Sequence, residues 1–208
     1  MKITLTGLDE KTDLSRLAHL KDVEFGILWR VVSGKRYPRV EWIREAVKVL
    51  DHTSIHVCGN QAIELVTALD QDFLHVADRI QLNGKLEPTT VYKVLSKYKK
   101  PVITQYCKEN MSLMRLILDF KHQLLVDASG GKGILPSYWP SLLTFKAVGF
   151  AGGLNWQNLH IQLPLIRAVE RKDCWIDMES SLRINDKFSI DLALETVSVF
   201  NELKNCKQ

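Results

Sequence analysis

Short runs of apolar residues, often β-branched, recur along this chain every 20 to 30 residues or so. Longer stretches in which apolar residues follow a helical period separate them. Runs of this length that alternate with amphipathic stretches are typical of strands and helices that follow one another along the chain. The pattern predicts eight strands, which begin near residues 2, 23, 54, 79, 101, 124, 147 and 174.

The segments between these runs predict the helices. In residues 39–50, one apolar stripe is formed by Trp42, Ile43, Ala46 and Val47 together with Leu50, and a stripe of this kind more simply faces a core than a cofactor. Residues 135–145 carry two prolines, which favour a short helix or a turn. The predicted helices cover residues 13–20, 39–50, 60–69, 89–99, 110–120, 158–170 and 190–203.

Apolar strands that alternate with amphipathic helices indicate parallel βαβ units. Eight such units predict an α/β protein with a (β/α)8 TIM barrel, formed as a single domain by residues 1–208. A doubly wound open sheet is the alternative. The count of eight favours the barrel, although 208 residues lie near the lower size limit of that fold.

Composition and charge narrow the class of protein. Hydrophobic residues make up 46% and charged residues 25% of the chain, as in ordinary globular proteins, and the net charge is +4. The longest basic cluster, 97–100, lies at the end of a predicted helix, so we interpret it as solvated and expect no nucleic-acid partner. No apolar run reaches the roughly 18 residues of a membrane span, and the N-terminus lacks a signal-peptide segment, so we expect no membrane partner and a cytoplasmic location.

The four cysteines do not suggest a disulfide framework or a zinc site. They lie far apart in the sequence and include no CxxC pair. We therefore expect no bound metal. The cysteines are Cys58, Cys107, Cys174 and Cys206.

Polar residues gather where the predicted strands end. In a parallel barrel the C-terminal ends of the strands form one rim, and the active site lies there. A barrel end that served stability alone would not need such a set. The residues at these ends are Thr6, Asp9, His56, Cys58, Gln81, Asn83, Gln105, Asp127, Asp177, Glu179, Ser180 and Ser181.

Two glycine-rich segments follow predicted strands. The first, LVDASGGKGI, places Gly130, Gly131 and Gly133 just after Asp127, and the second is AGGLN at residues 151–155. Glycines allow the backbone to approach a ligand closely, and free backbone N–H groups at a helix start favour an anion such as phosphate. The alternative is that Gly152 and Gly153 only make a tight turn.

At these segments the chain resembles phosphoribosylanthranilate isomerase, a TIM barrel of tryptophan biosynthesis. The resemblance rests on LLVDASGGKG, FAGGLNWQN and WIDMESSLRINDKFSIDLALETVSVF, with SGKRYPRVEWI after the second strand. It is strongest from residue 124 onward. It implies an Amadori rearrangement of a phosphorylated sugar amine, in which an acid and a base move protons and no cofactor is needed.

Carried over by motif, the resemblance implies a role for several residues. Asp127 would be the general acid, and Arg36 would orient a small anionic, phosphosugar-like substrate, with Thr6 and Asp177 beside it. The phosphate would be held by Gly131, Gly152, Gly153, Ser180 and Ser181. A monomer or a homodimer is expected.

The chain departs from the family at several places. Thr6 stands where the family has its cysteine base, and a threonine hydroxyl cannot serve as that base unaided. His56, Cys58 and Asp9 are the candidate replacements, although His56 could be a hydrogen-bonded barrel residue and Cys58 a small buried one. Glu179 stands beside the phosphate position and would repel the anion unless it turns away or Arg183 or Lys132 neutralises it.

Isomerisation of phosphoribosylanthranilate itself stays open, but the missing base argues against it. Two other functional hypotheses remain. One is a diverged isomerase that acts on a phosphorylated or otherwise anionic sugar derivative by acid–base proton transfer. The other is a barrel without turnover that binds a ligand or a partner. Lys132, which stands where the family has threonine, could pair with an anionic ligand or lie solvated in its loop.

Overall fold

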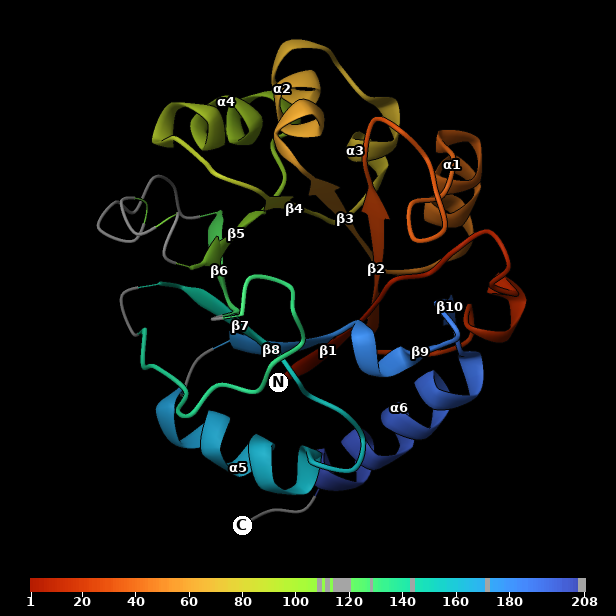
Figure 1. Ribbon diagram of the computed structural model, residues 1–208, viewed down its shortest axis with the longest axis vertical. Helices are drawn as coiled ribbons and strands as arrows, with labels where there is room; N and C mark the ends of the chain where they lie inside the picture. Colours follow the sequence, from red (N-terminus) through yellow and green to blue (C-terminus); the bar gives the residue numbers. More distant parts are fainter. Residues whose placement is uncertain are drawn as a thin grey trace.

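The computed structural model describes residues 1–107, 110, 113, 121–127, 129–142, 145–170 and 173–205. Eight parallel strands close into a barrel in the order β1 to β8, and the helices surround them (Figure 1). The predicted (β/α)8 barrel is therefore confirmed, and the doubly wound sheet is excluded. The strands are β1 (Lys2–Thr6), β2 (Val23–Trp29), β3 (Thr53–Cys58), β4 (Arg79–Asn83), β5 (Val102–Tyr106), β6 (His122–Val126), β7 (Ala147–Ala151) and β8 (Asp173–Met178).

Alternation along each strand divides the molecule into two cores. The outward side chains, such as Ile3 and Leu5 of β1, belong to a large apolar cluster that they form with the helices. A separate small cluster contains Ile103, Leu125 and Trp175. The other side chains that point into the barrel are mostly polar. The interior therefore differs from the layers of branched apolar residues that are usual in such barrels.

Charged residues fill the interior near the N-terminal ends of the strands. The Arg79 guanidinium donates to both carboxylate oxygens of Glu24, at 2.7 and 2.5 Å, and to Gln123 Oε1 at 2.9 Å. It also stacks 4.1 Å from the Trp175 ring. Gly149 makes room for that ring, since a Cβ at this position would lie 2.2 Å from it.

The helices agree with the predicted pattern in most places. They are α1 (Val40–Val49), α2 (Asn60–Ala68), α3 (Asp72–Val76), α4 (Pro88–Tyr98), α5 (Leu159–Val169) and α6 (Ile190–Asn205). The prediction of a full helix over 13–20 was wrong, because only a 3-10 turn, η1 (Leu14–Arg16), forms there. Residues 135–142 contain no helix or strand. The helix predicted over 110–120 falls almost entirely outside the described residues.

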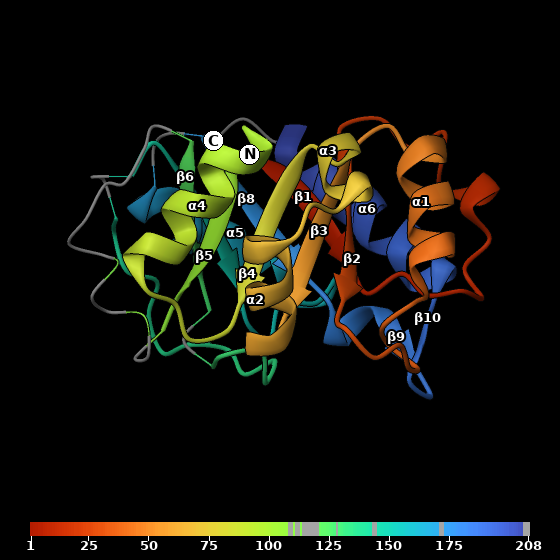
Figure 2. The ribbon, with the colours of Figure 1, turned by 90° about the horizontal axis from the view of Figure 1, so that it is seen from above.

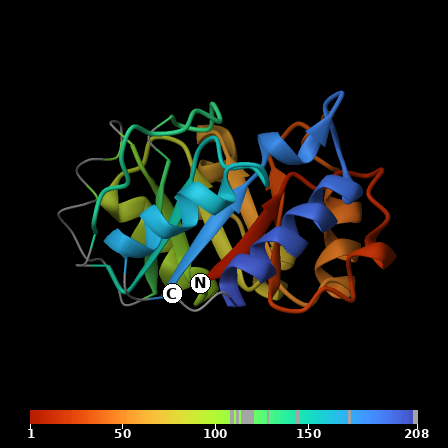
Figure 3. The same cartoon turned by 90° about the horizontal axis from the view of Figure 1, so that it is seen from below.

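A small hairpin after β8 was not predicted. A 3-10 turn, η4 (Ser180–Leu182), leads into β9 (Arg183–Ile184) and β10 (Lys187–Phe188). Asp9 holds the hairpin against the β1 loop, because its carboxylate accepts from the Phe188 backbone N–H at 2.9 Å and from Arg183 at 3.2 Å. Figures 2 and 3 place the hairpin at the opposite end of the barrel from the N-terminus.

No helix within the described part of the chain is long and apolar enough to cross a bilayer.

Candidate functional site

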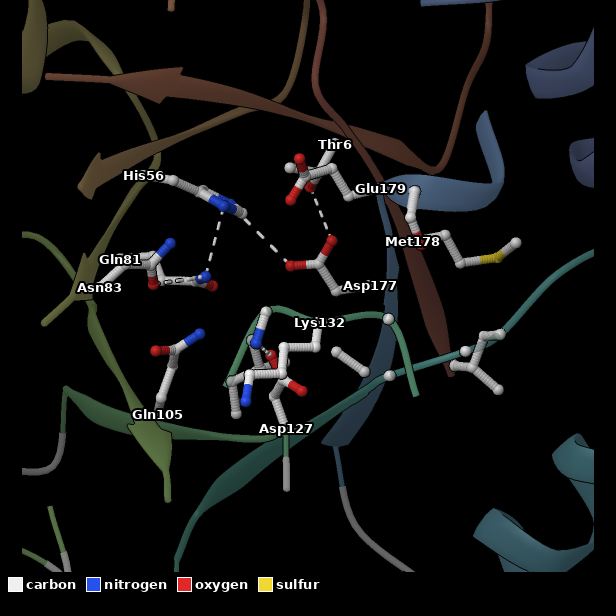
Figure 4. A pocket seen from close by; sticks show the side chains of 18 of the residues that line it. Thr6, His56, Gln81, Asn83, Gln105, Asp127, Lys132, Asp177, Met178 and Glu179 are labelled. Atoms are coloured by element: carbon white, nitrogen blue, oxygen red, sulfur yellow. Dashed lines mark hydrogen bonds and ion pairs between the residues drawn. The ribbon is translucent and has the colours of Figure 1, made fainter. Parts of the chain in front are cut away.

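A cavity of about 250 Å³ opens at the C-terminal ends of the strands. Of the eleven residues proposed from the sequence as catalytic, substrate-binding or phosphate-binding, nine line it, namely Thr6, Arg36, His56, Asp127, Gly131, Gly152, Gly153, Asp177 and Ser180. Cys58 and Ser181 do not line it. Figure 4 shows side chains from opposite walls of the barrel that point into this one space.

Asp127 follows β6 directly and is 4% exposed. The loop behind it folds back onto its carboxylate: the Ser129 hydroxyl donates to Oδ1 at 2.8 Å and the Gly131 N–H donates to Oδ2 at 2.6 Å. The N–H group of Gly131, which the sequence assigned to phosphate, is therefore engaged with Asp127. The turn needs a glycine because Gly131 has φ +85°.

Asp177 on β8 lies beside Thr6 on β1. The Thr6 hydroxyl donates to Asp177 Oδ1 at 2.6 Å, and His56 Nε2 lies 4.0 Å from Oδ2. Gly26 of β2 leaves space for Thr6, since a Cβ there would lie 2.1 Å from its hydroxyl oxygen. The position of the family's cysteine thus holds a hydroxyl that is bound to a buried carboxyl group.

Burial shifts the pKa values of three side chains in this region, Asp177, His56 and Cys58. It raises the pKa of Asp177 to about 7, against the opposing hydrogen bond from Thr6. It lowers the pKa of His56 to about 3, with a further contribution from the Arg79 charge. It raises the pKa of Cys58 to about 12. Near neutral pH the Cys58 thiol keeps its proton and His56 is a weak base, so Asp177 has the proton affinity best suited to proton transfer.

A chain of hydrogen bonds links β3 and β4 behind His56. The Cys58 thiol contacts the His56 carbonyl oxygen at 3.2 Å, and Asn83 Nδ2 donates to Cys58 Sγ at 3.6 Å. Gln81 Nε2 donates to Asn83 Oδ1 at 3.0 Å and lies 3.3 Å from His56 Nδ1. The chain fixes the orientation of the side chains on this wall of the cavity.

Arg36 and Glu179 form a pair at the edge of the cavity. The Arg36 guanidinium lies 3.3 Å from Glu179 and donates to Asp186 at 3.1 Å. The sequence offered Arg183 or Lys132 as residues that could neutralise Glu179. In the structure Arg36 makes the ion pair, and Arg183 binds Asp9. Burial raises the pKa of Glu179, whereas the charges of Arg36 and Arg183 lower it.

Gly152 and Gly153 pack closely against another loop. A Cβ at Gly152 would lie 2.8 Å from the Ile134 carbonyl oxygen, and one at Gly153 would lie 2.5 Å from the Leu135 nitrogen. The loop after β6, bright green in Figure 1, runs over this side of the barrel. Packing against the loop is therefore one reason why glycine is needed at these two positions. The backbone of the same two residues also lines the cavity.

Some lining residues had no role in the sequence-based site. Gln81, Asn83 and Gln105 were recognised at strand ends but assigned no chemistry, and Met178 and Leu154 were missed. Strand alternation was the available signal for the three carboxamides, because Gln81 is two residues after Arg79 on the inward side of β4. Asp9, a candidate base, does not line this cavity and serves the hairpin instead.

Two further observations bear on ligands. A second opening of about 520 Å³ lies at the other end of the barrel, around Glu24, Arg79 and Trp175. Within the described ranges, no group of three or more His, Cys, Asp or Glu side chains could hold a metal ion.

Comparison with known proteins shows the fold. No protein-family model matches the sequence, and no curated protein matches it significantly. Phosphoribosyl anthranilate isomerase from Thermus thermophilus is similar in structure, with TM-score 0.73 and 20% identity over 98% of this chain and 100% of that one. TrpF from Jonesia denitrificans gives TM-score 0.72 and 16% identity over 100% of both chains.

A third similar structure contains a ligand. It is a phosphoribosyl anthranilate isomerase in complex with reduced 1-(o-carboxyphenylamino)-1-deoxyribulose 5-phosphate, with TM-score 0.68 and 17% identity over 97% of this chain and 99% of that one. The chain therefore has the (β/α)8 barrel fold of the phosphoribosylanthranilate isomerases, at low sequence identity to them.

Proposed function

We propose that this chain is an acid–base isomerase that acts on a phosphorylated or otherwise anionic sugar derivative. The observation that carries the proposal is that two carboxyl groups, Asp127 from β6 and Asp177 from β8, line one cavity at the end of the barrel where such enzymes bind their substrates. An acid and a base on one substrate are what an aldose–ketose rearrangement requires.

In the proposed mechanism, Asp127 donates a proton to the ring oxygen as the C1–O bond breaks and the sugar opens. The Asp177 carboxylate then removes the C2 proton next to the C1 carbonyl or imine carbon. The electrons of the C2–H bond form the C1=C2 double bond of an enediol or enolamine, while the C1 oxygen or nitrogen takes back the proton that it gave up when the ring opened. Asp177 then returns its proton to C1, and the C2 hydroxyl proton passes to the Asp127 carboxylate, which gives the ketose and restores both groups. The Asp177 pKa of about 7 lets this group accept and release a proton near neutral pH.

The anionic end of the substrate is placed at the glycine side of the cavity. Lys132, Ser180 and the Gly152–Gly153 backbone line that side. Glu179 lies near them, but its ion pair with Arg36 offsets its charge. Lys132 supplies the positive charge for the anion in this arrangement.

Deuterium exchange tests the proposal on two simple sugar phosphates. Ribose 5-phosphate and ribulose 5-phosphate are incubated with the protein in D2O, and NMR follows deuterium at C2 of the aldose and C1 of the ketose. The wild type is expected to catalyse exchange, and Asp127→Asn and Asp177→Asn are each expected to slow it by about 100-fold or more. Glu195→Gln, an exposed residue of α6, serves as the control.

The pH dependence assigns the roles. If Asp177 is the base, the exchange rate rises with pH up to about 7 and levels off above it, because the carboxylate is the active form. A rate that falls through the same range would make Asp177 the acid. Absence of exchange, together with no turnover of phosphoribosylanthranilate, would contradict catalysis and favour a barrel that only binds a ligand.

A further inference from the structure

One wall of the cavity is built from uncharged polar side chains. His56 comes from β3, Gln81 and Asn83 from β4, and Gln105 from β5, and Figure 4 shows all four around the same space. We call these four residues the amide wall. Within the described residues, no Phe, Tyr or Trp side chain lines the cavity.

The hydrogen-bond chain leaves a defined donor and a defined acceptor on this wall. Gln81 Nε2 is directed at Asn83 Oδ1 and His56 Nδ1, so Gln81 Oε1 remains as an acceptor, and it is buried without a partner among the described residues. Gln81 is only 2% exposed. With Nδ1 of His56 accepting from Gln81, the proton of the neutral ring lies on Nε2, which becomes a donor.

A buried acceptor without a partner weakens folding unless a ligand supplies a donor. A hydroxyl group both donates and accepts, so hydroxyl groups can pair with Gln81 Oε1 as donors and with His56 Nε2–H as acceptors. An aromatic hydrocarbon ring offers neither, and covering the amide wall with one would leave these groups unpaired.

The charges at the edge of the cavity also argue against an aromatic carboxylate in the ligand. Arg36 is engaged by two carboxylates, Glu179 and Asp186, so it offers little uncompensated positive charge to a carboxylate on a substrate. A carboxyphenyl group placed at this edge would lie beside the Glu179 carboxylate, with Arg36 already engaged by two carboxylates.

We propose that the amide wall binds hydroxyl groups, so that the ligand is a non-aromatic polyol with its anionic group at the opposite, glycine-lined side. This inference rests on the proposed function and narrows its substrate class. It distinguishes the site from one that accepts an arylamine.

Calorimetric titration with four probes tests the proposal. The probes are ribitol 5-phosphate, uncharged ribitol, inorganic phosphate, and reduced 1-(o-carboxyphenylamino)-1-deoxyribulose 5-phosphate. Ribitol 5-phosphate is expected to bind at least as tightly as the aryl compound. Gln81→Leu is expected to weaken ribitol 5-phosphate about tenfold or more, because a hydrogen bond to a buried acceptor is lost, and to leave inorganic phosphate unchanged.

Two further variants guard against a general loss of structure. Gln105→Leu removes a half-buried member of the amide wall and is expected to weaken ribitol 5-phosphate selectively. Gln162→Leu changes a buried glutamine on α5 that contacts Trp139 outside the cavity, and it is expected to leave all four affinities unchanged.

The outcomes separate this inference from the proposed function. If the aryl compound binds more than tenfold tighter than ribitol 5-phosphate, or if neither amide-wall variant alters the binding of a polyol, the inference is wrong while the anion site stands. If ribitol binds through Gln81 but phosphate adds nothing, the amide wall stands and the anionic substrate is wrong. Failure of every probe to bind at millimolar concentration would overturn both.

Discussion

The buried pair of His56 and Asp177 makes a prediction about stability that needs no substrate. Between about pH 4 and 6.5 the folded protein holds Asp177 protonated and His56 neutral, whereas the unfolded chain holds Asp177 charged and His56 protonated. The two groups together therefore bind the same number of protons in both states, and their effects on stability cancel in this range.

If either group is removed, the free energy of unfolding keeps only the pH dependence that the other group causes. In Asp177→Asn only His56 remains, and because its pKa falls from 6.5 to about 3 on folding, stability is lost as the pH drops below 6.5. In His56→Gln only Asp177 remains, and because its pKa rises from 3.8 to about 7, stability is lost as the pH rises above 4. At about 1.4 kcal/mol for each tenfold change in proton affinity, the full effects are about 5 and about 4 kcal/mol, respectively.

Urea unfolding followed by tryptophan fluorescence at pH 4.5, 5.5 and 6.5 measures these slopes. Relative to the wild type, the free energy of unfolding of Asp177→Asn should increase with pH and that of His56→Gln should decrease, each by about 1 kcal/mol per pH unit. Glu195→Gln should run parallel to the wild type. If the free energies of unfolding of Asp177→Asn and His56→Gln show the same pH dependence as that of the wild type, the folded protein does not keep Asp177 protonated and His56 neutral in this range. The argument for Asp177 as a base would then lose its support.

Three other variants test separate parts of the structure. Arg79→Met should lower the free energy of unfolding by about 3 kcal/mol in urea unfolding, because it leaves the partly buried Glu24 carboxylate without its cation, and adding Glu24→Leu should recover part of the loss; an additive double variant would contradict a coupled pair. Gly149→Ala should cost about 1–3 kcal/mol in thermal unfolding because its Cβ would overlap the Trp175 ring, and a neutral effect would mean that the ring is not held there. Thr6→Val removes a hydrogen bond that lowers the Asp177 pKa, so the pH at which exchange reaches half its maximum should rise; an unchanged midpoint would separate Thr6 from the base.

The barrel could be predicted from the sequence because the outward side chains of its strands are apolar and often β-branched. Runs such as the one beginning near residue 54 stand out against the amphipathic helices on either side. The turn at Leu14–Arg16 was overestimated as a helix, since Leu14 and Leu17 have helical spacing but only one short turn forms. The β9–β10 hairpin has strands of two residues, which are too short to give a periodic signal.

The residues of the candidate site could be predicted from the sequence, but the contacts between their side chains could not. The ends of the strands identified Asp127, His56 and Asp177, because a parallel barrel brings such ends together. The contact of Thr6 with Asp177 joins residues 171 positions apart, and the pairing of Arg36 with Glu179 depends on side-chain conformations that no local pattern encodes. The effects of burial on Asp177, His56 and Cys58 likewise depend on the assembled interior.

A crystal structure of the protein with ribitol 5-phosphate would test the central claim most directly. The account predicts that the phosphate lies against Lys132, Ser180 and the Gly152–Gly153 backbone, with the carbon chain between Asp127 and Asp177 and a hydroxyl group on Gln81 Oε1. Binding instead at the larger opening around Glu24 and Arg79, or a phosphate that avoids the glycine side because of Glu179, would contradict it.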